Sequence, residues 1–208
     1  MIDASSAGLF LGASVLLAFA PGPDNIFVLT QSILFGRRAG IMIVLGLCTG
    51  LLVHTSVVAC GLAALFTTSV LAFNILKYCG AAYLLWLAVM SFRSSGSAIE
   101  MTKSAKLTPF QLYRRGIIMN VTNPKVSIFF LAFLPQFTKP ANGSMVLQII
   151  QLGVLFILVT FFVFGLIAAA SGYAGEKITS SGRWQSVLNK VAGTVFAALA
   201  LKLVFTKQ

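Results

Sequence analysis

Three ionisable side chains lie near the centres of long apolar runs in this 208-residue sequence: Asp24, His54 and Lys125. At the centre of a bilayer, an aspartate or a lysine costs on the order of 2.5–3.5 kcal/mol even on permissive insertion scales. Such residues usually face the interior of a helix bundle and mark the path of an ion or a substrate. These three residues are therefore the first candidates for a functional site.

Helix breakers stand directly before two of these charges, Asp24 and Lys125. Proline removes a backbone donor and clashes with the preceding turn, so a helix stops or kinks there. The half-helix that follows exposes unpaired N–H groups and the positive end of its dipole, which can hold an anion such as a carboxylate. The residues of the two breaks are Pro21, Gly22 and Pro23 in the first and Pro124 in the second.

The polar groups around the two breaks could bind a molecule that carries both an ammonium and a carboxylate. Asp24 would meet the ammonium or a proton, and Lys125 would help to bind the carboxylate. The neighbouring amides could contact the same molecule or could only cap the broken helix ends. The structural alternative is a permanent ion pair between Asp24 and Lys125 that neutralises two buried charges. The candidate substrate-binding residues are Asp24, Asn25, Asn120, Asn123 and Lys125.

His54 lies in the apolar string "GLLVHTSVV" (50–58). Histidine titrates near physiological pH, so His54, together with Asp24, is a candidate for proton coupling. The alternative is a neutral histidine that bonds to a nearby hydroxyl or carbonyl. Gly46 and Gly50 have the G-x-x-x-G spacing of close helix contacts, which would form within one chain or between copies in a homo-oligomer.

The composition indicates an integral membrane protein. Hydrophobic residues make up 58% of the chain and charged residues only 9%, with a mean hydropathy of +0.96. A soluble domain normally has about 25% charged residues. Only helices and closed barrels satisfy their backbone groups in hydrocarbon, and the apolar runs here are continuous rather than alternating. The sequence therefore predicts an all-α protein embedded in the lipid bilayer, without a soluble domain.

Six apolar runs are long enough to cross a bilayer, which takes roughly 20 residues. The first and fourth runs contain the proline breaks, and the whole chain, 1–208, is expected to form one transmembrane domain. The predicted spans are about 6–34, 41–66, 70–92, 111–135, 146–172 and 187–205.

An internal repeat relates the two halves of the chain. "PDNIFVL" (23–29) aligns with "PKVSIFF" (124–130), and "KYCGAAYLLWLAVMSFR" (77–93) aligns with "KVAGTVFAALALKLVFT" (190–206). Because each half has three spans, the halves must be inverted, an architecture typical of secondary transporters with a site at the membrane midplane. The expected units are repeat 1 at about 1–93, a polar loop at about 94–110 and repeat 2 at about 111–208.

Basic residues are unevenly distributed between the two sides that six spans define. Of the fifteen Lys and Arg residues, ten lie on the side of the central loop, four on the other side, and Lys125 within a span. Positive residues accumulate in cytoplasmic loops, so both termini are expected on the periplasmic or extracellular side. The ten are Arg37, Arg38, Arg93, Lys103, Lys106, Arg114, Arg115, Lys177, Arg183 and Lys190; the four are Lys77, Lys139, Lys202 and Lys207.

Other classes of function have weaker support. A net charge of +11 would suggest nucleic acid as the partner of a soluble protein, but cytoplasmic loops explain this excess in a membrane protein. Cys48, Cys60 and Cys79 lie away from both breaks without C-x-x-C spacing, which disfavours a thiol-based electron-transfer protein. One aspartate and one histidine make a poor divalent-cation site, which disfavours a metal transporter or an ion channel. No enzymatic activity, metal or cofactor is predicted.

Two strings resemble the LysE/RhtB family of amino-acid exporters: "SVLLAFAPGPDNIFVLTQSILFGRRAGI" (14–41) and "NVTNPKVSIFFLAFLPQF" (120–137). "KYCGAAYLLWLA" (77–88) extends the resemblance. "GLCTGLLVHTSVVACGLAALF" (46–66) is most similar to the branch of homoserine, homoserine-lactone and threonine exporters. The resemblance implies efflux of a small amino acid or derivative from the bacterial cytoplasm across the inner membrane, driven by proton antiport.

Overall fold

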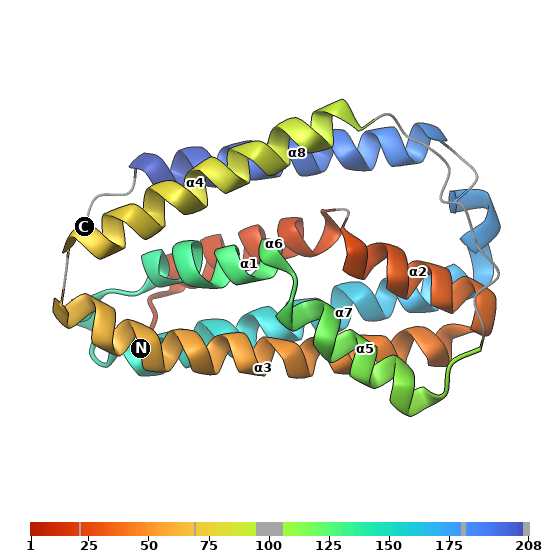
Figure 1. Cartoon of the computed structure of the whole chain (residues 1–208), viewed down its shortest axis with the longest axis horizontal. Helices are drawn as coiled ribbons and strands as arrows, with labels where there is room; N and C mark the ends of the chain where they lie inside the picture. The colour runs from red at the N-terminus through yellow and green to blue at the C-terminus, as the bar shows by residue number, and fades with distance from the viewer. Residues whose placement is uncertain (21, 69, 95–105, 180–181, 206–208) are drawn as a thin grey trace.

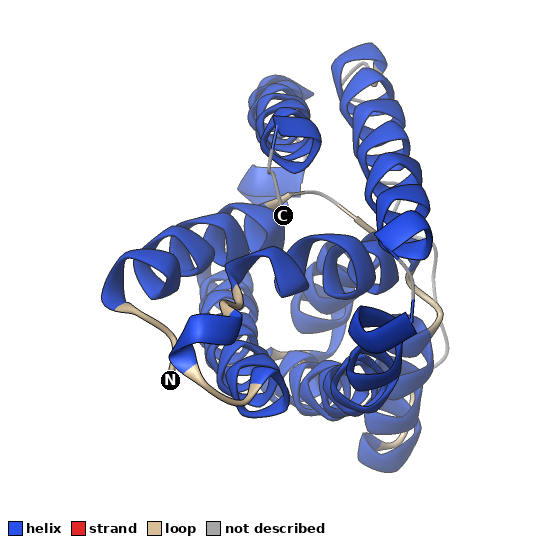
Figure 2. Cartoon of the chain, turned by 90° about the vertical axis from the view of Figure 1, so that its left-hand side faces the viewer, coloured by secondary structure: helices blue, strands red, loops and turns tan. Residues whose placement is uncertain are grey.

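The structure is a computed structural model that describes the chain except for residues 21, 69, 95–105, 180–181 and 206–208. Its regular elements are all helical, and the described residues contain no strand (Figure 2). The all-α prediction is confirmed. The α-helices are α1 (Ala4–Phe19), α2 (Pro23–Phe35), α3 (Arg37–Thr68), α4 (Val70–Arg93), α5 (Pro109–Val121), α6 (Pro124–Ile128), α7 (Met145–Thr179) and α8 (Gly182–Phe205). Three shorter helical segments are η1 (Phe129–Phe133), η2 (Leu134–Phe137) and η3 (Pro140–Asn142).

Both predicted helix breaks are present. α1 and α2 are bent by 59° relative to each other, and α5 and the segment that follows from α6 are bent by 49°. Pro23 and Pro124 each occupy the start of the second helix of their pair, where the missing N–H leaves no intrahelical bond unmade. Pro21 lies outside the described residues.

Two single helices are long and apolar enough to cross a membrane, over Arg37–Gly61 in α3 and Met145–Ser171 in α7. If each bent pair counts as one span, the described residues supply up to four spans. α4 and α8 have 24 residues each and reach about 36 Å at about 1.5 Å per residue, but the candidate spans found among the described residues do not include them. The six-span inverted repeat therefore remains a prediction, in which α4 and α8 would be the third and sixth spans.

The helices are arranged in layers around the two breaks (Figure 1). α4 and α8 pack side by side along one side of the molecule, and α3 packs with α5 and α7 on the opposite side. The broken helices α1 and α2 and the short α6 lie between these layers; α1 and α6 contact both layers, and α2 packs against α3, α5 and α7. The breaks are thus enclosed by the longer helices.

Glycines let α3 and α5 approach backbone to backbone. A Cβ on Gly116 would lie 2.5 Å from the carbonyl oxygen of Ile43, and a Cβ on Gly46 would overlap the carbonyl oxygen of Tyr113. One turn further along α3, a Cβ on Gly50 would lie 2.7 Å from the amide oxygen of Asn120. The G-x-x-x-G motif therefore serves a contact within the chain, and this contact sets the position of Asn120.

A cluster of six buried phenylalanines fills the space between α1, α7 and the segment η1–η2. Their ring centroids lie 5.0 to 6.4 Å apart, in tilted and edge-to-face arrangements that favour aromatic packing. η1 is a single π-helical turn, a feature frequent at functional sites that the sequence pattern does not predict. The cluster consists of Phe10, Phe129, Phe130, Phe133, Phe137 and Phe156.

Candidate functional site

The two helix breaks meet, although they are separated by about a hundred residues of sequence. The side-chain amide of Asn123 donates a hydrogen bond of 2.8 Å to Oδ2 of Asp24. The ammonium of Lys125 donates one of 3.0 Å to the carbonyl oxygen of Ala20. Asp24, Asn123 and Lys125 are 3%, 5% and 7% exposed, so the structure brings three of the predicted site residues into one buried cluster.

Asp24 and Lys125 do not form a direct ion pair. Among the described residues, the ion pair closer than 4.0 Å is that of Asp3 with Lys139, at 2.9 Å. Asn123 joins the two charged residues instead, because its amide oxygen also accepts the backbone N–H of Lys125 at 3.0 Å and caps α6. The charges of Asp24 and Lys125 still act on each other through space. The carboxylate therefore keeps one oxygen uncommitted.

Three buried acceptors near the breaks have no hydrogen-bond partner in the described structure: Oδ1 of Asp24, Oδ1 of Asn25 and Oδ1 of Asn120. Leaving a buried acceptor unsatisfied costs about 1–3 kcal/mol, and more for a charged group. Such groups therefore call for an explanation, often a ligand or a role in function. Unpartnered acceptors beside one cluster favour a ligand that brings hydrogen-bond donors, such as an ammonium.

Asn25 and Gly22 stabilise the backbone of the first break, and neither of them lines the cavity. The amide of Asn25 donates to the carbonyl oxygen of Ala18 at 2.8 Å and so satisfies the end of α1. A Cβ on Gly22 would lie 3.0 Å from the ammonium nitrogen of Lys125, so the absence of a side chain lets Lys125 reach Ala20. Asn25 acts here as a helix cap, one of the two roles expected for it.

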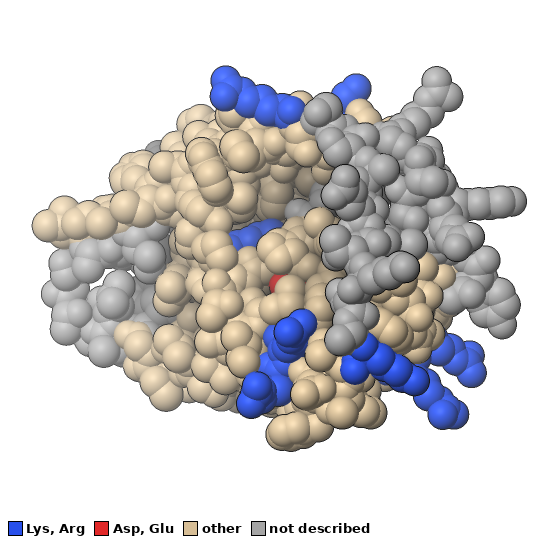
Figure 3. Space-filling view, turned by 45° about the vertical axis from the view of Figure 1, so that its right-hand side comes forward, with Lys and Arg blue, Asp and Glu red and all other residues tan. Residues whose placement is uncertain are grey.

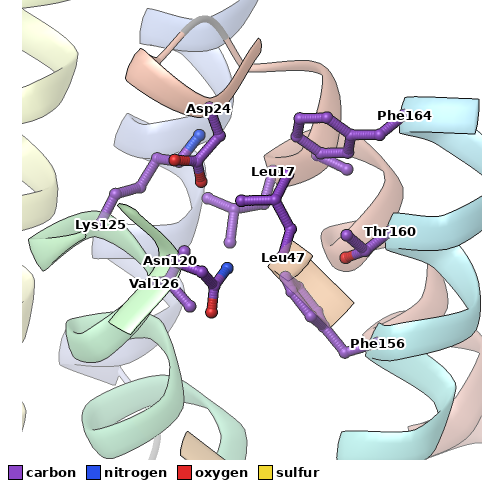
Figure 4. Close-up of a pocket in the computed structure, with 10 residues that line it drawn as sticks. Leu17, Asp24, Leu47, Asn120, Lys125, Val126, Phe156, Thr160 and Phe164 are labelled. Atoms are coloured by element: carbon purple, nitrogen blue, oxygen red, sulfur yellow. The ribbon is translucent and has the colours of Figure 1, made fainter. Parts of the chain in front are cut away.

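A cavity lies beside the breaks (Figure 4). Asp24, Asn120 and Lys125 provide polar groups from α2, α5 and α6, and α7 provides Thr160. The remaining lining is apolar, with the larger side chains Leu17, Leu47, Val126, Phe156 and Phe164. A polar region next to apolar walls can hold a small molecule with a charged head and an uncharged tail.

Charged atoms are visible inside a hollow on one face of the molecule (Figure 3). Figure 3 shows basic and acidic atoms inside a hollow, among uncharged residues. Further basic side chains project from the same face into the surroundings.

His54 lies beside the cavity but does not line it. Its Nε2 is 3.1 Å from the backbone carbonyl oxygen of Asn120, and because a carbonyl can only accept, Nε2 carries the proton in this contact. The imidazole also packs against the ring of Phe130, with centroids 5.5 Å apart. The half-buried His54 thus makes the carbonyl contact expected of a neutral histidine, and its role in proton coupling stays a prediction.

The cysteines do not take part in this arrangement. Cys48 is half-buried, Cys60 and Cys79 are exposed, and all three are free thiols. The cavity lining contains none of them. Within the described residues, no group of three or more His, Cys, Asp and Glu side chains could hold a metal ion. The geometry therefore offers no support for the thiol-based alternative.

The wall that α7 contributes to the cavity is not apparent from the sequence. Phe156, Thr160 and Phe164 are spaced four residues apart and so share one helix face, which lines the cavity. The signal that was available is Thr160, a hydroxyl inside the apolar string "GVLFILVTFFVFGL" (153–166). Phe156 and Phe164 have no distinguishing mark among the many phenylalanines of the chain.

A helical membrane protein whose two broken helices place opposite charges beside a buried cavity has the construction of a secondary translocator. The family model of LysE type translocators matches residues 15–207. The chain belongs to this family, as the sequence motifs predicted.

Named relatives span nearly the full length of the chain. It is 36% identical over 204 residues to the homoserine/homoserine lactone efflux protein of Salmonella typhimurium, with 96% of both chains covered. It is 26% identical over 198 residues to the leucine efflux protein of Salmonella typhimurium, covering 93% of this chain and 92% of the relative. An uncharacterized membrane protein of Vibrio cholerae is 30% identical over 198 residues, with 95% and 96% covered. No solved structure matches the chain.

Proposed function

We propose that this protein exports small amino acids or close derivatives from the bacterial cytoplasm across the inner membrane, as a secondary transporter driven by proton antiport. The observation that carries the proposal is the pair of unpartnered acceptors, Oδ1 of Asp24 and Oδ1 of Asn120, beside the ammonium of Lys125 in one cavity. This arrangement complements a zwitterion. Relatives that are named as efflux proteins for homoserine, its lactone and leucine support the same substrate class.

The substrate ammonium would bind between Asp24 and Asn120, where it satisfies both free acceptors. The substrate carboxylate would bind to Lys125, whose ammonium donates to Ala20 and keeps further N–H donors. The free N–H groups at the start of α2 lie at the positive end of its dipole and would add to carboxylate binding. The side chain of the substrate would then lie between the apolar walls.

Competition for Asp24 would couple substrate export to proton import. The carboxylate of Asp24 can be neutralised by the substrate ammonium or by a proton, but it cannot bind both at once. A cycle in which Asp24 releases the substrate outside and returns protonated exchanges one amino acid for one proton. His54, bonded to the backbone of Asn120, is the second candidate for carrying or passing the proton.

Alternating access would come from rearrangement of the two halves around the cavity. The contacts of Asn123 with Asp24 and of Lys125 with Ala20 join the breaks of the two halves, so these contacts would change during the cycle. In this arrangement the central loop is cytoplasmic and both termini lie outside, consistent with the distribution of basic residues.

Efflux from proteoliposomes tests the proposal. Vesicles loaded with radiolabelled amino acids are assayed with and without a pH gradient, for the wild type, Asp24→Asn and the matched control Asp3→Asn. We expect the gradient to accelerate efflux in the wild type and in Asp3→Asn, and Asp24→Asn to lose this acceleration. Efflux that ignores both the gradient and Asp24→Asn would contradict proton antiport, and absence of any amino-acid efflux would contradict the substrate class.

A further inference from the structure

Thr160 is a polar side chain in the otherwise apolar wall that α7 presents to the cavity. It is 3% exposed and stands one helical turn from Phe156 and one from Phe164, on the same face. Figure 4 shows it across the cavity from Asn120 and Lys125, with Leu17 and Leu47 between them. A molecule held at the polar wall would thus direct its far end toward Thr160.

The hydroxyl of Thr160 differs from the other buried hydroxyls on the described helices, which are hydrogen-bonded. A helical serine or threonine usually donates to the carbonyl four residues earlier. Within the part of the chain that the structure describes, no hydrogen bond is found for the hydroxyl of Thr160, and the residue lines the cavity. Among the described residues, eight helical residues do make the usual bond: Ser14, Ser32, Thr49, Thr55, Ser56, Ser127, Ser171 and Thr194.

Three unpartnered polar groups therefore line one cavity: Oδ1 of Asp24, Oδ1 of Asn120 and the hydroxyl of Thr160. The first two are acceptors suited to an ammonium. The third can both donate and accept, and its apolar surroundings disfavour a charged partner. The chemistry that fits this third group is an uncharged oxygen on the substrate side chain.

We propose that Thr160 is a specificity-determining residue, which hydrogen-bonds an oxygen atom on the side chain of the transported amino acid. This inference rests on the proposed function and adds the selection among small amino acids. A site that hydrogen-bonds a substrate hydroxyl discriminates against an analogue that lacks it, because the protein group is then left unpaired. The wild-type protein therefore prefers a short hydroxyl-bearing amino acid over an apolar isostere.

The test compares efflux of homoserine and norvaline, which differ by a hydroxyl in place of a methyl group. Proteoliposomes that contain both labelled substrates are assayed for the wild type, Thr160→Val, Thr160→Ser and the control Thr194→Val. Valine keeps the shape of threonine without its hydroxyl, serine keeps the hydroxyl, and Thr194 lies exposed on α8.

We expect the preference for homoserine over norvaline to fall about tenfold in Thr160→Val, as for loss of one hydrogen bond of about 1.4 kcal/mol. Thr160→Ser and Thr194→Val should keep the wild-type ratio, and norvaline efflux should persist in Thr160→Val, which shows that this variant is folded. Each substrate should also raise the melting temperature of the detergent-solubilised protein. In Thr160→Val, the rise caused by homoserine should shrink relative to the rise caused by norvaline.

An unchanged ratio of homoserine to norvaline efflux in Thr160→Val would overturn the inference and leave the proposed function standing. If the wild type exports neither homoserine nor norvaline, the proposed function is contradicted, and the inference with it. The two failures are therefore distinguishable in one experiment.

Discussion

The ammonium of Lys125 satisfies the backbone carbonyl of Ala20, at 3.0 Å. In an uninterrupted helix, this carbonyl would accept the N–H of the residue four positions later, which is Asp24. The first break removes that bond, and a lysine of the second break replaces it. Each break is thus completed by the other, so the position of one half of the chain at this point depends on the position of the other half.

Asn123 should be the residue whose loss most weakens the junction of the two breaks. Asn123→Ala removes the cap of α6 and the hydrogen bond to Asp24, and we expect the free energy of unfolding to fall by about 2–4 kcal/mol. Denaturant unfolding in detergent measures this change. Asn74→Ala, which replaces a half-buried asparagine of α4, should change it by less than about 0.5 kcal/mol; equal effects of the two substitutions would contradict the prediction.

Gly22→Ala should impair transport while leaving the fold intact. The new Cβ would lie 3.0 Å from the ammonium nitrogen of Lys125, which ends a flexible side chain and can move aside. The backbone at Gly22 is extended, with φ −164°, so alanine is not strained there. We expect efflux to fall several-fold, measured in proteoliposomes, with a melting temperature close to that of the wild type.

Gly12→Ala is the matched control for Gly22→Ala. Gly12 lies within α1, and a Cβ there would meet nothing within 4 Å. This substitution should leave efflux unchanged and stabilise the helix by about 0.5–1 kcal/mol. If Gly22→Ala transports as well as Gly12→Ala, transport does not depend on the position of the Lys125 ammonium beside Ala20.

Asp3 should contribute a pH dependence to stability that is separate from the pH dependence of transport. Hydrogen bonds from the hydroxyl of Ser5, from Lys139 and from the backbone N–H of Ser6 hold the pKa of Asp3 well below its ordinary value of 3.8. A lowered pKa in the folded state stabilises the fold above the ordinary pKa, and this contribution is lost as the pH falls further toward the folded-state value. The contacts of Asp3 should therefore persist across the physiological range.

Melting temperatures of the wild type and Asp3→Asn check this prediction. Their difference should stay constant between about pH 5 and pH 8 and should shrink below about pH 4. A difference that changes across the upper range would show that Asp3 titrates there. If the difference is constant, a pH dependence of efflux in that range has to come from other groups, of which Asp24 and His54 are the candidates.

The helix breaks show how far local patterns predict the site. Pro23 and Pro124 stop a helix because of their own ring and missing N–H, so the positions of both bends follow from residues next to them in the sequence. The G-x-x-x-G spacing predicts a close helix contact for the same reason, but not its partner. That Gly46 meets Gly116 of α5 depends on how two distant helices cross.

The charged pair shows where local patterns end. Asp24 and Lys125 are recognisable from the sequence as costly charges in apolar runs, and the structure places them in one cluster. It also gives each a neutral partner, Asn123 for Asp24 and the carbonyl of Ala20 for Lys125. Asn123 and Lys125 both lie next to Pro124 in the sequence. The sequence alone therefore does not decide which of the two contacts Asp24.

By itself, the sequence determined that this protein lies in a lipid bilayer, that it is helical, and where two of its helices break. Hydropathy and proline geometry act over a few residues, so local sequence is enough to set these features. The tertiary structure alone decided that the breaks face each other, that Asn123 rather than Lys125 bonds Asp24, and that α7 completes the cavity with Phe156, Thr160 and Phe164. These contacts join segments far apart in the chain. Their geometry is set by the packing of whole helices, which no local pattern encodes.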